Sequence, residues 1–359
     1  MSSLKISFAF LGAALLASSS ALAQSSASIY GILDAGVTRV SNANGGRLAL
    51  LDTGVMQASR LGYRGVEDLG GGMSALFLLE QGIILDTGAS GQGGLLFGRQ
   101  SWVGLSDAKL GVLTLGRQYD FMFDSLVGFI NPSLSAGGYA NNPLDNDRMS
   151  GQRVNNSMKY QSPVVNGFSA GALVAFSETR DSARGTGFSR SFGANYKNGP
   201  FGAGVAYTYL QGASLDIRSL VGASAATVVG GVQNEAYGIG ASYQVTSQLL
   251  VHAVANRSKF DGPDLARTAQ FRNIEGGVVY SPVASWRFGA AVNTTKLRDN
   301  DYRQLNLTAD YILSRRTDLY VQAIHQKADG AGATANIFLL PGSSDRTQTA
   351  LRVGVRHRF

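Results

Sequence analysis

The sequence predicts an all-β chain of sixteen antiparallel strands that close into a membrane-spanning barrel. Three patterns predict it: apolar and polar residues alternate along most of the chain, short and long connections alternate, and aromatic residues gather beside the short ones. Beyond the N-terminus no stretch offers the roughly 18 consecutive apolar residues of a spanning helix. Hydrophobic residues make up 44% of the chain, which argues against disorder. The absence of cysteine excludes disulfides and thiolate metal sites.

Residues 1–23 predict a secretory signal peptide. Lys5 precedes an apolar run from Ile6 to Ala17, and Ala21-Leu22-Ala23 forms a small-x-small cleavage pattern. The run has about a dozen residues, against the ~20 of a membrane anchor. We expect cleavage after Ala23, which leaves 24–359 as the barrel domain.

The last segment of the chain shows the strand pattern most clearly. Leu351, Val353 and Val355 alternate with Arg352 and Arg356. Successive side chains of a strand point to opposite faces, so a period of two with charge on one face predicts a half-buried strand. The segments around 237–243, 273–280 and 303–313 repeat the pattern.

The connections between these segments set the number of strands. Seven short turns alternate with eight longer loops, and fifteen connections join sixteen strands. Aromatic residues flank the short turns, as they do at a membrane–water boundary; they are Phe168, Tyr196, Phe201, Tyr243, Tyr280, Trp286 and Tyr311. A soluble all-β sandwich is the alternative, but the second face is rich in Arg, Asn, Gln and Gly, which favours a wet lumen. Closure into a barrel pairs every backbone group in lipid.

Six motifs in order resemble the general porins of the Gram-negative outer membrane, of the β-proteobacterial type. They are Ile29–Gly36, Ser59–Gly72, Gly98–Leu105, Leu113–Asp120, Arg153–Tyr160 and the terminal Phe359. The resemblance runs from Ser28 to Phe359. It implies a sixteen-stranded barrel with short periplasmic turns, long extracellular loops and a third loop folded into the lumen. It also implies a homotrimer in the outer membrane, surrounded by lipid and lipopolysaccharide, through which small hydrophilic solutes and inorganic ions diffuse.

Charged residues of inward parity are the candidates for a pore constriction. Alternation places Arg60, Arg64, Arg153 and Lys159 inside the barrel, and Arg99 inside because it would face away from Trp102. A cation on the lipid face would cost ~2–4 kcal/mol at mid-membrane. Arg117 shares the parity of Leu113 and Leu115, so we expect it outside unless the chain bends. Glu80 is the one acid expected on the inner wall. The resemblance points to Arg60, Arg99 and Arg153 as the residues that line the narrowest ring.

The connection 120–150 is about 31 residues long and predicts an inward-folded loop that narrows the pore. Loops of this length are usually functional or disordered. Its acids Asp120 and Asp124 are further constriction candidates. Because Arg and Lys rings favour anions, the excess of inner arginines predicts a moderate anion preference.

Other functions find little support in the residues. Gly167–Gly171 matches G-x-S-x-G, but the strand–turn–helix context of a nucleophile is missing. The three histidines lack metal-ligand spacing, and the arginines are spread over strands without a basic tail. We therefore expect no enzyme, cofactor, metal or nucleic-acid partner. A substrate-specific channel stays open as an alternative, and so, less favoured, does a barrel enzyme or an adhesin.

The terminal residue predicts an assembly signal. Phe359 ends an alternating strand, and outer-membrane barrels of the resembled type commonly end in an aromatic residue that the barrel-assembly machinery reads. We expect deletion of Phe359 to reduce insertion.

Overall fold

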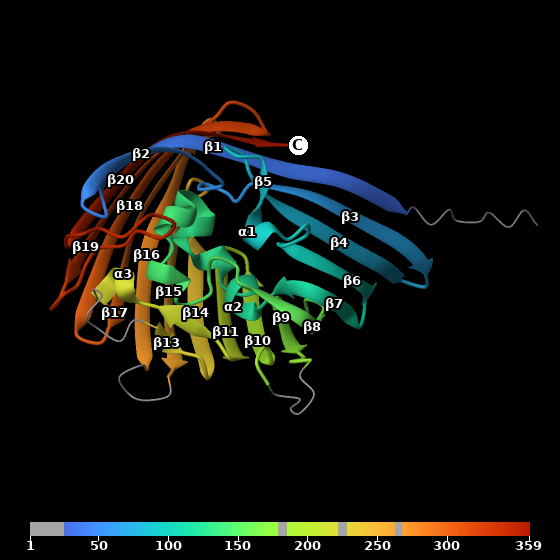
Figure 1. Cartoon of the computed structure of the whole chain (residues 1–359). Coiled ribbons are helices and arrows are strands. Elements are labelled where there is room, and N and C mark those ends of the chain that lie inside the picture. The colour runs from blue at the N-terminus through green and yellow to red at the C-terminus, as the bar shows by residue number, and fades with distance from the viewer. Residues whose placement is uncertain (1–24, 179–184, 222–227, 263–267) are drawn as a thin grey trace, which may run out of the picture.

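Sixteen antiparallel strands form a closed barrel (Figure 1). The structure is a computed structural model that describes residues 25–178, 185–221, 228–262 and 268–359, so the expected signal peptide lies outside the described residues. The barrel strands are β1 (Ser26–Ala43), β3 (Arg60–Gly70), β4 (Met73–Ile84), β6 (Gln100–Asp107), β7 (Gly111–Tyr119), β8 (Arg153–Gln161), β9 (Phe168–Ala175), β10 (Ser189–Asn198), β11 (Phe201–Gln211), β14 (Gln233–Gln244), β15 (Leu249–Asp261), β16 (Ala269–Val283), β17 (Trp286–Leu297), β18 (Asn300–Ile312), β19 (Thr317–Asp329) and β20 (Thr347–Arg358). Strand β20 closes the barrel on β1, in register from Ile32–Arg358 to Val40–Ala350.

The predicted alternation is confirmed along the wall. On β20, Leu351 and Val353 are 53% and 62% exposed on the outside, while Arg352 between them is 1% exposed on the inside. The outer face is therefore apolar and suits lipid, while the inner face carries the polar side chains. Among the described residues, no helix is long and apolar enough to cross a membrane.

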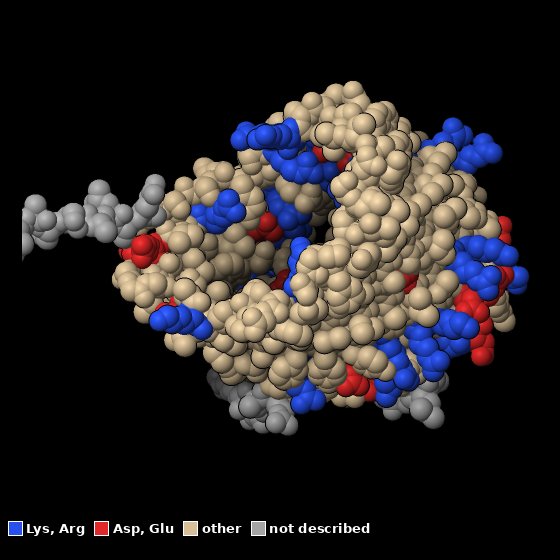
Figure 2. All heavy atoms as spheres, turned by 180° about the vertical axis from the view of Figure 1, so that it is seen from behind, with Lys and Arg blue, Asp and Glu red and all other residues tan. Residues whose placement is uncertain are grey.

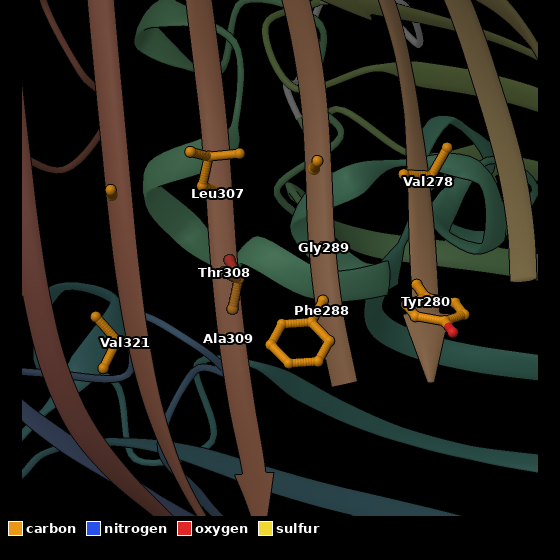
Figure 3. Close-up of a pocket in the computed structure, with 10 residues that line it drawn as sticks. Val278, Tyr280, Phe288, Gly289, Leu307, Thr308, Ala309 and Val321 are labelled. Carbon is orange, nitrogen blue, oxygen red and sulfur yellow. The ribbon is translucent and has the colours of Figure 1, made fainter. Parts of the chain in front are cut away.

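Aromatic side chains surround the short turns on the outer face. Trp286 stacks on Phe288 with centroids 5.5 Å apart and contacts Tyr311 across the strand pair at 4.8 Å. Above them, between β16 and β19, the wall has an apolar hollow of about 400 Å³ (Figure 3). Val278, Tyr280, Phe288, Leu307 and Val321 line it, so it faces lipid and is not part of the channel.

The first long connection, which we expected as a loop over Ser41–Asp52, is instead mostly a strand pair. Strand β1 runs on to Ala43 and forms a hairpin with β2 (Gly46–Thr53). Asn44 and Gly45 both have positive φ, 53° and 96°, as a tight two-residue turn between twisted strands requires. After Thr53 the chain leaves the sheet for residues 54–59 and rejoins it as β3, which pairs with the first half of β1. The alternation of apolar and polar residues within 41–52 is the sequence pattern that would have predicted this strand pair.

The segment 120–152 lies inside the barrel (green in Figure 1). It contains the short helical turns α2 (Phe121–Asp124), η1 (Val127–Phe129), η2 (Pro132–Ala136), η3 (Gly138–Ala140) and η4 (Pro143–Asp145). The other loops carry β5 (Ala89–Ser90), α1 (Gly91–Gly94), β12 (Ser214–Asp216), α3 (Arg218–Val221) and β13 (Val228–Gly230). We refer to 120–152 as the inner loop.

Apolar packing holds the inner loop against the wall. Phe121, Met122 and Leu126 are at most 1% exposed and belong to one cluster with the inward residues Leu173 and Val254. Burial of each such side chain is worth about 1.5–3 kcal/mol. Small residues on the wall make room for the loop. Gly240 is an example, because a Cβ at this position would lie only 2.8 Å from Phe129 and would clash with it. An inner wall with small and apolar positions therefore selects the inward conformation.

Candidate pore constriction

Three arginines from separate parts of the chain meet on the inner wall. Arg60 begins β3, Arg99 immediately precedes β6, and Arg153 begins β8. Glu80 on β4 lies 3.7 Å from Arg60 Nη1 and 2.7 Å from Arg99 Nε. The Tyr119 hydroxyl accepts hydrogen bonds from Arg99 at 2.8 Å and from Arg153 at 3.2 Å. We call these five residues the arginine cluster.

Local structure aims Arg99 into this cluster. Gln100 pairs with Glu80, and Trp102 pairs with Leu78. Trp102 therefore lies on the inner face, and not on the outer face where we expected it. Strict alternation would then turn Arg99 outward. Arg99 instead lies before the first residue of β6, where its backbone N–H still donates to the Glu80 carbonyl at 3.1 Å. The end of the strand therefore frees the side chain to turn inward.

The arginine cluster carries more positive than negative charge. It contains three guanidinium groups and one carboxylate, a net charge of +3 − 1 = +2. Glu80 is further held by the Tyr30 hydroxyl, which donates to it at 2.8 Å. The Arg153 guanidinium lies over the Tyr119 ring, 5.0 Å from its centroid, and has no acidic partner among the described residues. A surplus of fixed positive charge on a low-dielectric wall produces a field that attracts anions.

The two predicted acids of the inner loop have cationic partners of their own. Asp120 is fully buried, pairs with Arg148 at 2.6 Å and caps α2 by accepting from the Met122 N–H at 3.0 Å. Asp124 pairs with Lys159 of β8. Both predicted acids are therefore neutralised by nearby cations and do not pair with the arginine cluster.

Arg64 and Arg117 form no ion pair or hydrogen bond with a member of the arginine cluster. Arg64 is exposed, donates to the Ser28 hydroxyl at 3.0 Å and lies 5.5 Å from the Tyr30 ring centroid. Arg117 is half-buried at an irregularity between Gly116 and Gln118, where it donates to the Gly98 carbonyl at 2.8 Å. We expect Arg117 to leave the outer face only if the chain bends, and the chain is irregular at this point.

A second charged group lies on the inner wall, at the seam between β1 and β20. We call it the seam cluster; it comprises Asp34, Asp52, Asp310 and Asp318 with Arg287, Arg352, Arg356 and Arg358. Arg352 contacts Asp34 at 3.3 Å and also pairs with Asp52. Arg356 contacts Asp318 at 2.9 Å and Asp310 at 3.4 Å. The prediction that Glu80 is the one acid on the inner wall is therefore wrong. The seam cluster is nevertheless neutral, because it contains four acids and four bases.

Sequence reasoning missed the seam cluster for a physical reason. Alternation places Arg352 and Arg356 on the inner face, so their orientation is visible in the sequence. Their acidic partners lie up to 318 residues away and become neighbours only when β20 closes on β1. Arg148 and Tyr119 were missed because a loop and a strand end carry no period.

The inner loop packs along the wall from β8 to β19, and only its first residues reach the arginine cluster, where Phe123 contacts Tyr119. Wall side chains bind its backbone at several points: Asn195 donates to the Ser125 carbonyl at 2.7 Å, and Gln322 donates to that of Ala136 at 2.7 Å. These contacts lie on β10 and β19, whereas the arginine cluster lies on β3–β8. Figure 2 shows an opening through the molecule with Lys and Arg groups at its edge. The channel is therefore bounded by the inner loop on one side and a basic wall on the other.

Comparisons with known proteins agree with this architecture. An outer membrane porin protein of Bordetella pertussis is 31% identical over 97% of this chain and 99% of its own. Outer membrane porin protein 32 of Delftia acidovorans is 31% identical over 97% and 98%. The solved anion-selective porin from Comamonas acidovorans superposes with a TM-score of 0.79 at 27% identity, covering 94% of this chain and 100% of that one.

A family model describes the same relationship. The model of the Gram-negative porins matches residues 10–331. OmpT of Vibrio cholerae, with a TM-score of 0.68 at 12% identity, shares the fold alone. Family, relatives and barrel agree on an outer-membrane channel. The chain belongs to the Gram-negative porins.

Proposed function

We propose that this porin is a diffusion channel with moderate anion preference, set by the arginine cluster where the inner loop narrows the lumen. The surplus positive charge at Arg60, Arg99 and Arg153 carries this proposal, because the seam cluster is neutral and Asp120 and Asp124 are paired with cations. Arginine stays charged at any working pH, so the preference does not depend on titration of the bases. The anion-selective porin from Comamonas acidovorans supports the proposal by its similarity.

The proposed solutes are small and hydrophilic, together with inorganic ions. A substrate-specific channel is the second candidate. It would need aromatic side chains exposed to the lumen, where a solute could contact them. Tyr139, Tyr302 and Tyr320 are each 1% exposed, so they support the wall and do not offer faces to a solute. A non-specific pore is therefore the better fit. Its relatives are channels, and we propose no catalytic activity.

Export and assembly complete the proposal. We propose cleavage after Ala23, passage to the outer membrane, recognition of the exposed terminal Phe359 by the insertion machinery, and a homotrimer embedded in outer-membrane lipid and lipopolysaccharide. Phe359 lies beside the barrel seam, where its N–H donates to the Gly31 carbonyl at 3.1 Å. Its ring is 43% exposed on the outer wall, within reach of another protein during insertion.

Planar-bilayer recording on the purified protein tests the channel proposal. The expected result is large stepwise conductance that rises with salt and is not blocked in a saturable way by any one sugar or amino acid. An adhesin or a barrel enzyme would give no steps. Saturable block by one solute class would favour a substrate-specific channel and overturn non-specific diffusion.

A further inference from the structure

A group of apolar side chains lies on the inner wall beside the arginine cluster. It consists of Val66 on β3, Leu76 and Leu78 on β4, and Trp102 on β6, three strands that lie side by side (Figure 1). Leu78 pairs in register with Trp102, and Val66 pairs with Leu76, so the four side chains are contiguous. We call them the apolar strip.

The apolar strip faces the lumen and not lipid. Leu78 lies two residues before Glu80 on β4 and therefore on the same face, where Glu80 pairs with Arg99. Val103, which follows the strip on β6, is 58% exposed on the outer wall. Val66 is 43% exposed, and the other members of the strip are half-buried. The strip is therefore open to a solute in the lumen.

Apolar side chains in this place are unusual for a channel wall. The inner face of a membrane barrel is ordinarily polar, because water fills the lumen. Apolar groups that stay in contact with water cost free energy, and an exposed apolar patch with polar surroundings is typical of a binding surface. The apolar residues of the inner loop pack elsewhere, on Leu173 of β9 and Val254 of β15. Packing of that loop therefore does not explain the strip.

Trp102 presents its ring to the channel. Its indole N–H donates to the Gln100 side chain at 3.1 Å, so the polar atom of the ring already has a partner. Two glycines flank the ring: Gly116 lies opposite Trp102 on β7, and Gly104 lies two residues further along β6. Neither glycine has a side chain that could cover the ring. Trp102 therefore provides an apolar surface for a solute.

Cations border the apolar strip on two sides. Arg64 pairs in register with Leu78 and forms no ion pair within the described part of the chain. The arginine cluster begins at the next pair of inner-face residues, Glu80 and Gln100, roughly 7 Å along the strands from Leu78 and Trp102. A solute that carries both an apolar group and a negative charge can therefore contact the strip and an arginine at the same time.

We propose that the apolar strip and its neighbouring arginines favour the passage of aryl carboxylates, in which one or two methylene groups separate an aromatic ring from the carboxylate. The carboxylate lies against the guanidinium groups, which bind carboxylates with charge-assisted hydrogen bonds, and the ring lies on Trp102 and Leu78. This inference rests on the proposed diffusion channel and names a class of solute that the channel favours.

The contact is weak, which keeps it compatible with diffusion. The strip holds one aromatic ring and three aliphatic side chains, and does not form a series of aromatic contacts along the whole channel. Aryl carboxylates therefore concentrate near the arginine cluster and pass faster than hydrophilic anions of the same charge. They do not saturate the channel.

Reversal potentials under bi-ionic conditions test this preference. Sodium 3-phenylpropionate is placed on one side of a planar bilayer, and sodium gluconate, a hydroxylated anion of the same charge, on the other, at neutral pH. After correction for mobility in free solution, we expect wild type to favour phenylpropionate roughly fivefold, which corresponds to about 1 kcal/mol. Equal corrected permeabilities in wild type would overturn the proposal.

Two variants show whether the apolar strip causes the preference. Leu78→Gln/Trp102→Gln replaces two members of the strip with polar side chains and should remove the preference. Leu78→Met/Trp102→Phe is the matched control, which keeps both positions apolar and should retain most of the preference. A preference that persists in the folded Gln variant, or that falls equally in the control, would overturn the assignment to the strip.

Conductance in potassium chloride separates the possible failures. Normal steps show that a variant folds and forms the channel. Val66→Gln changes the most exposed member of the strip and should lower the preference in part, so it decides the question if the double Gln variant does not fold; an unchanged preference in Val66→Gln would then overturn the proposal. Wild type without conductance steps would refute the channel itself, whereas normal steps with equal permeabilities would refute only the preference.

Discussion

Arg99 Nε and Glu80 Oε1 lie 2.7 Å apart in an ion pair whose two side chains are only 5% and 3% exposed. Glu80 also contacts Arg60, so a single carboxylate neutralises two arginines incompletely. This shared acid fixes the guanidinium groups in place while leaving their field uncompensated. We propose that the selectivity of the channel follows from that imbalance.

Replacement of Glu80 with Gln should strengthen anion preference. The change removes the only carboxylate of the arginine cluster and preserves the size of the side chain. A unit charge at about 7 Å in water is worth on the order of 0.6 kcal/mol, with opposite sign for an anion and a cation, so the anion-to-cation permeability ratio should rise roughly sevenfold in dilute salt. The reversal potential in a salt gradient measures it. An unchanged ratio in a folded variant would show that Glu80 lies outside the field that ions cross.

Removal of Pro132–Asn142 should raise single-channel conductance and admit larger sugars. This part of the inner loop is held by wall donors, among them Gln304, whose side chain donates to the Tyr139 carbonyl at 3.0 Å. Conductance steps and liposome swelling with sugars of graded size measure the effect. As a milder control, Gln304→Ala should increase current noise and leave the mean conductance unchanged. Unaltered conductance in a folded deletion variant would mean that the loop does not narrow the channel.

The sequence predicts the wall of this barrel better than its interior. Alternation correctly oriented Leu351 and Arg352 because a strand has a strict period of two. It misplaced Trp102, from which the inward position of Arg99 was argued, and it left Arg117 open, because Arg99 lies at a strand end and Arg117 at an irregularity, where the period breaks. The partners Arg148 of Asp120 and Asp34 of Arg352 could not be predicted, because loop conformation and barrel closure bring them together.

The packing of the inner loop should weaken as pH rises. Burial and the neighbouring Asp147 raise the pKa of Asp145 from 3.8 to about 7. The Asp145 carboxyl therefore binds its proton more tightly in the packed loop than in an unpacked loop. The stability that protonated Asp145 gives to the packed loop is fully present below about pH 4 and is lost as the pH rises through about 7.

Hydrogen exchange of the inner loop measures this dependence. After correction for intrinsic exchange, protection should fall by one to two orders of magnitude between pH 5 and pH 8. Asp145→Asn, which carries no charge, should flatten the profile. A rise in protection with pH would contradict the assignment to Asp145.

Deletion of Phe359 should sharply reduce the amount of porin in the outer membrane. The exposed ring at the barrel seam has the position of a recognition element. Phe359→Tyr keeps an aromatic ring and is the matched control. Fractionated membranes and heat-modifiable gel mobility report the folded protein. Normal abundance of folded protein after the deletion would remove Phe359 from the assembly step.

The anion preference itself should fade with salt. The Debye length falls from ~10 Å at 0.1 M to ~3 Å at 1 M, so the field of the arginine cluster reaches less of the channel. The most direct measurement is therefore the zero-current potential across a dilute salt gradient, for wild type and for Arg60→Ser/Arg99→Ser/Arg153→Ser. We expect anion selectivity in wild type and a clear shift toward cations in the triple variant. A cation-selective wild type, or an unaltered potential in a folded triple variant, would contradict it.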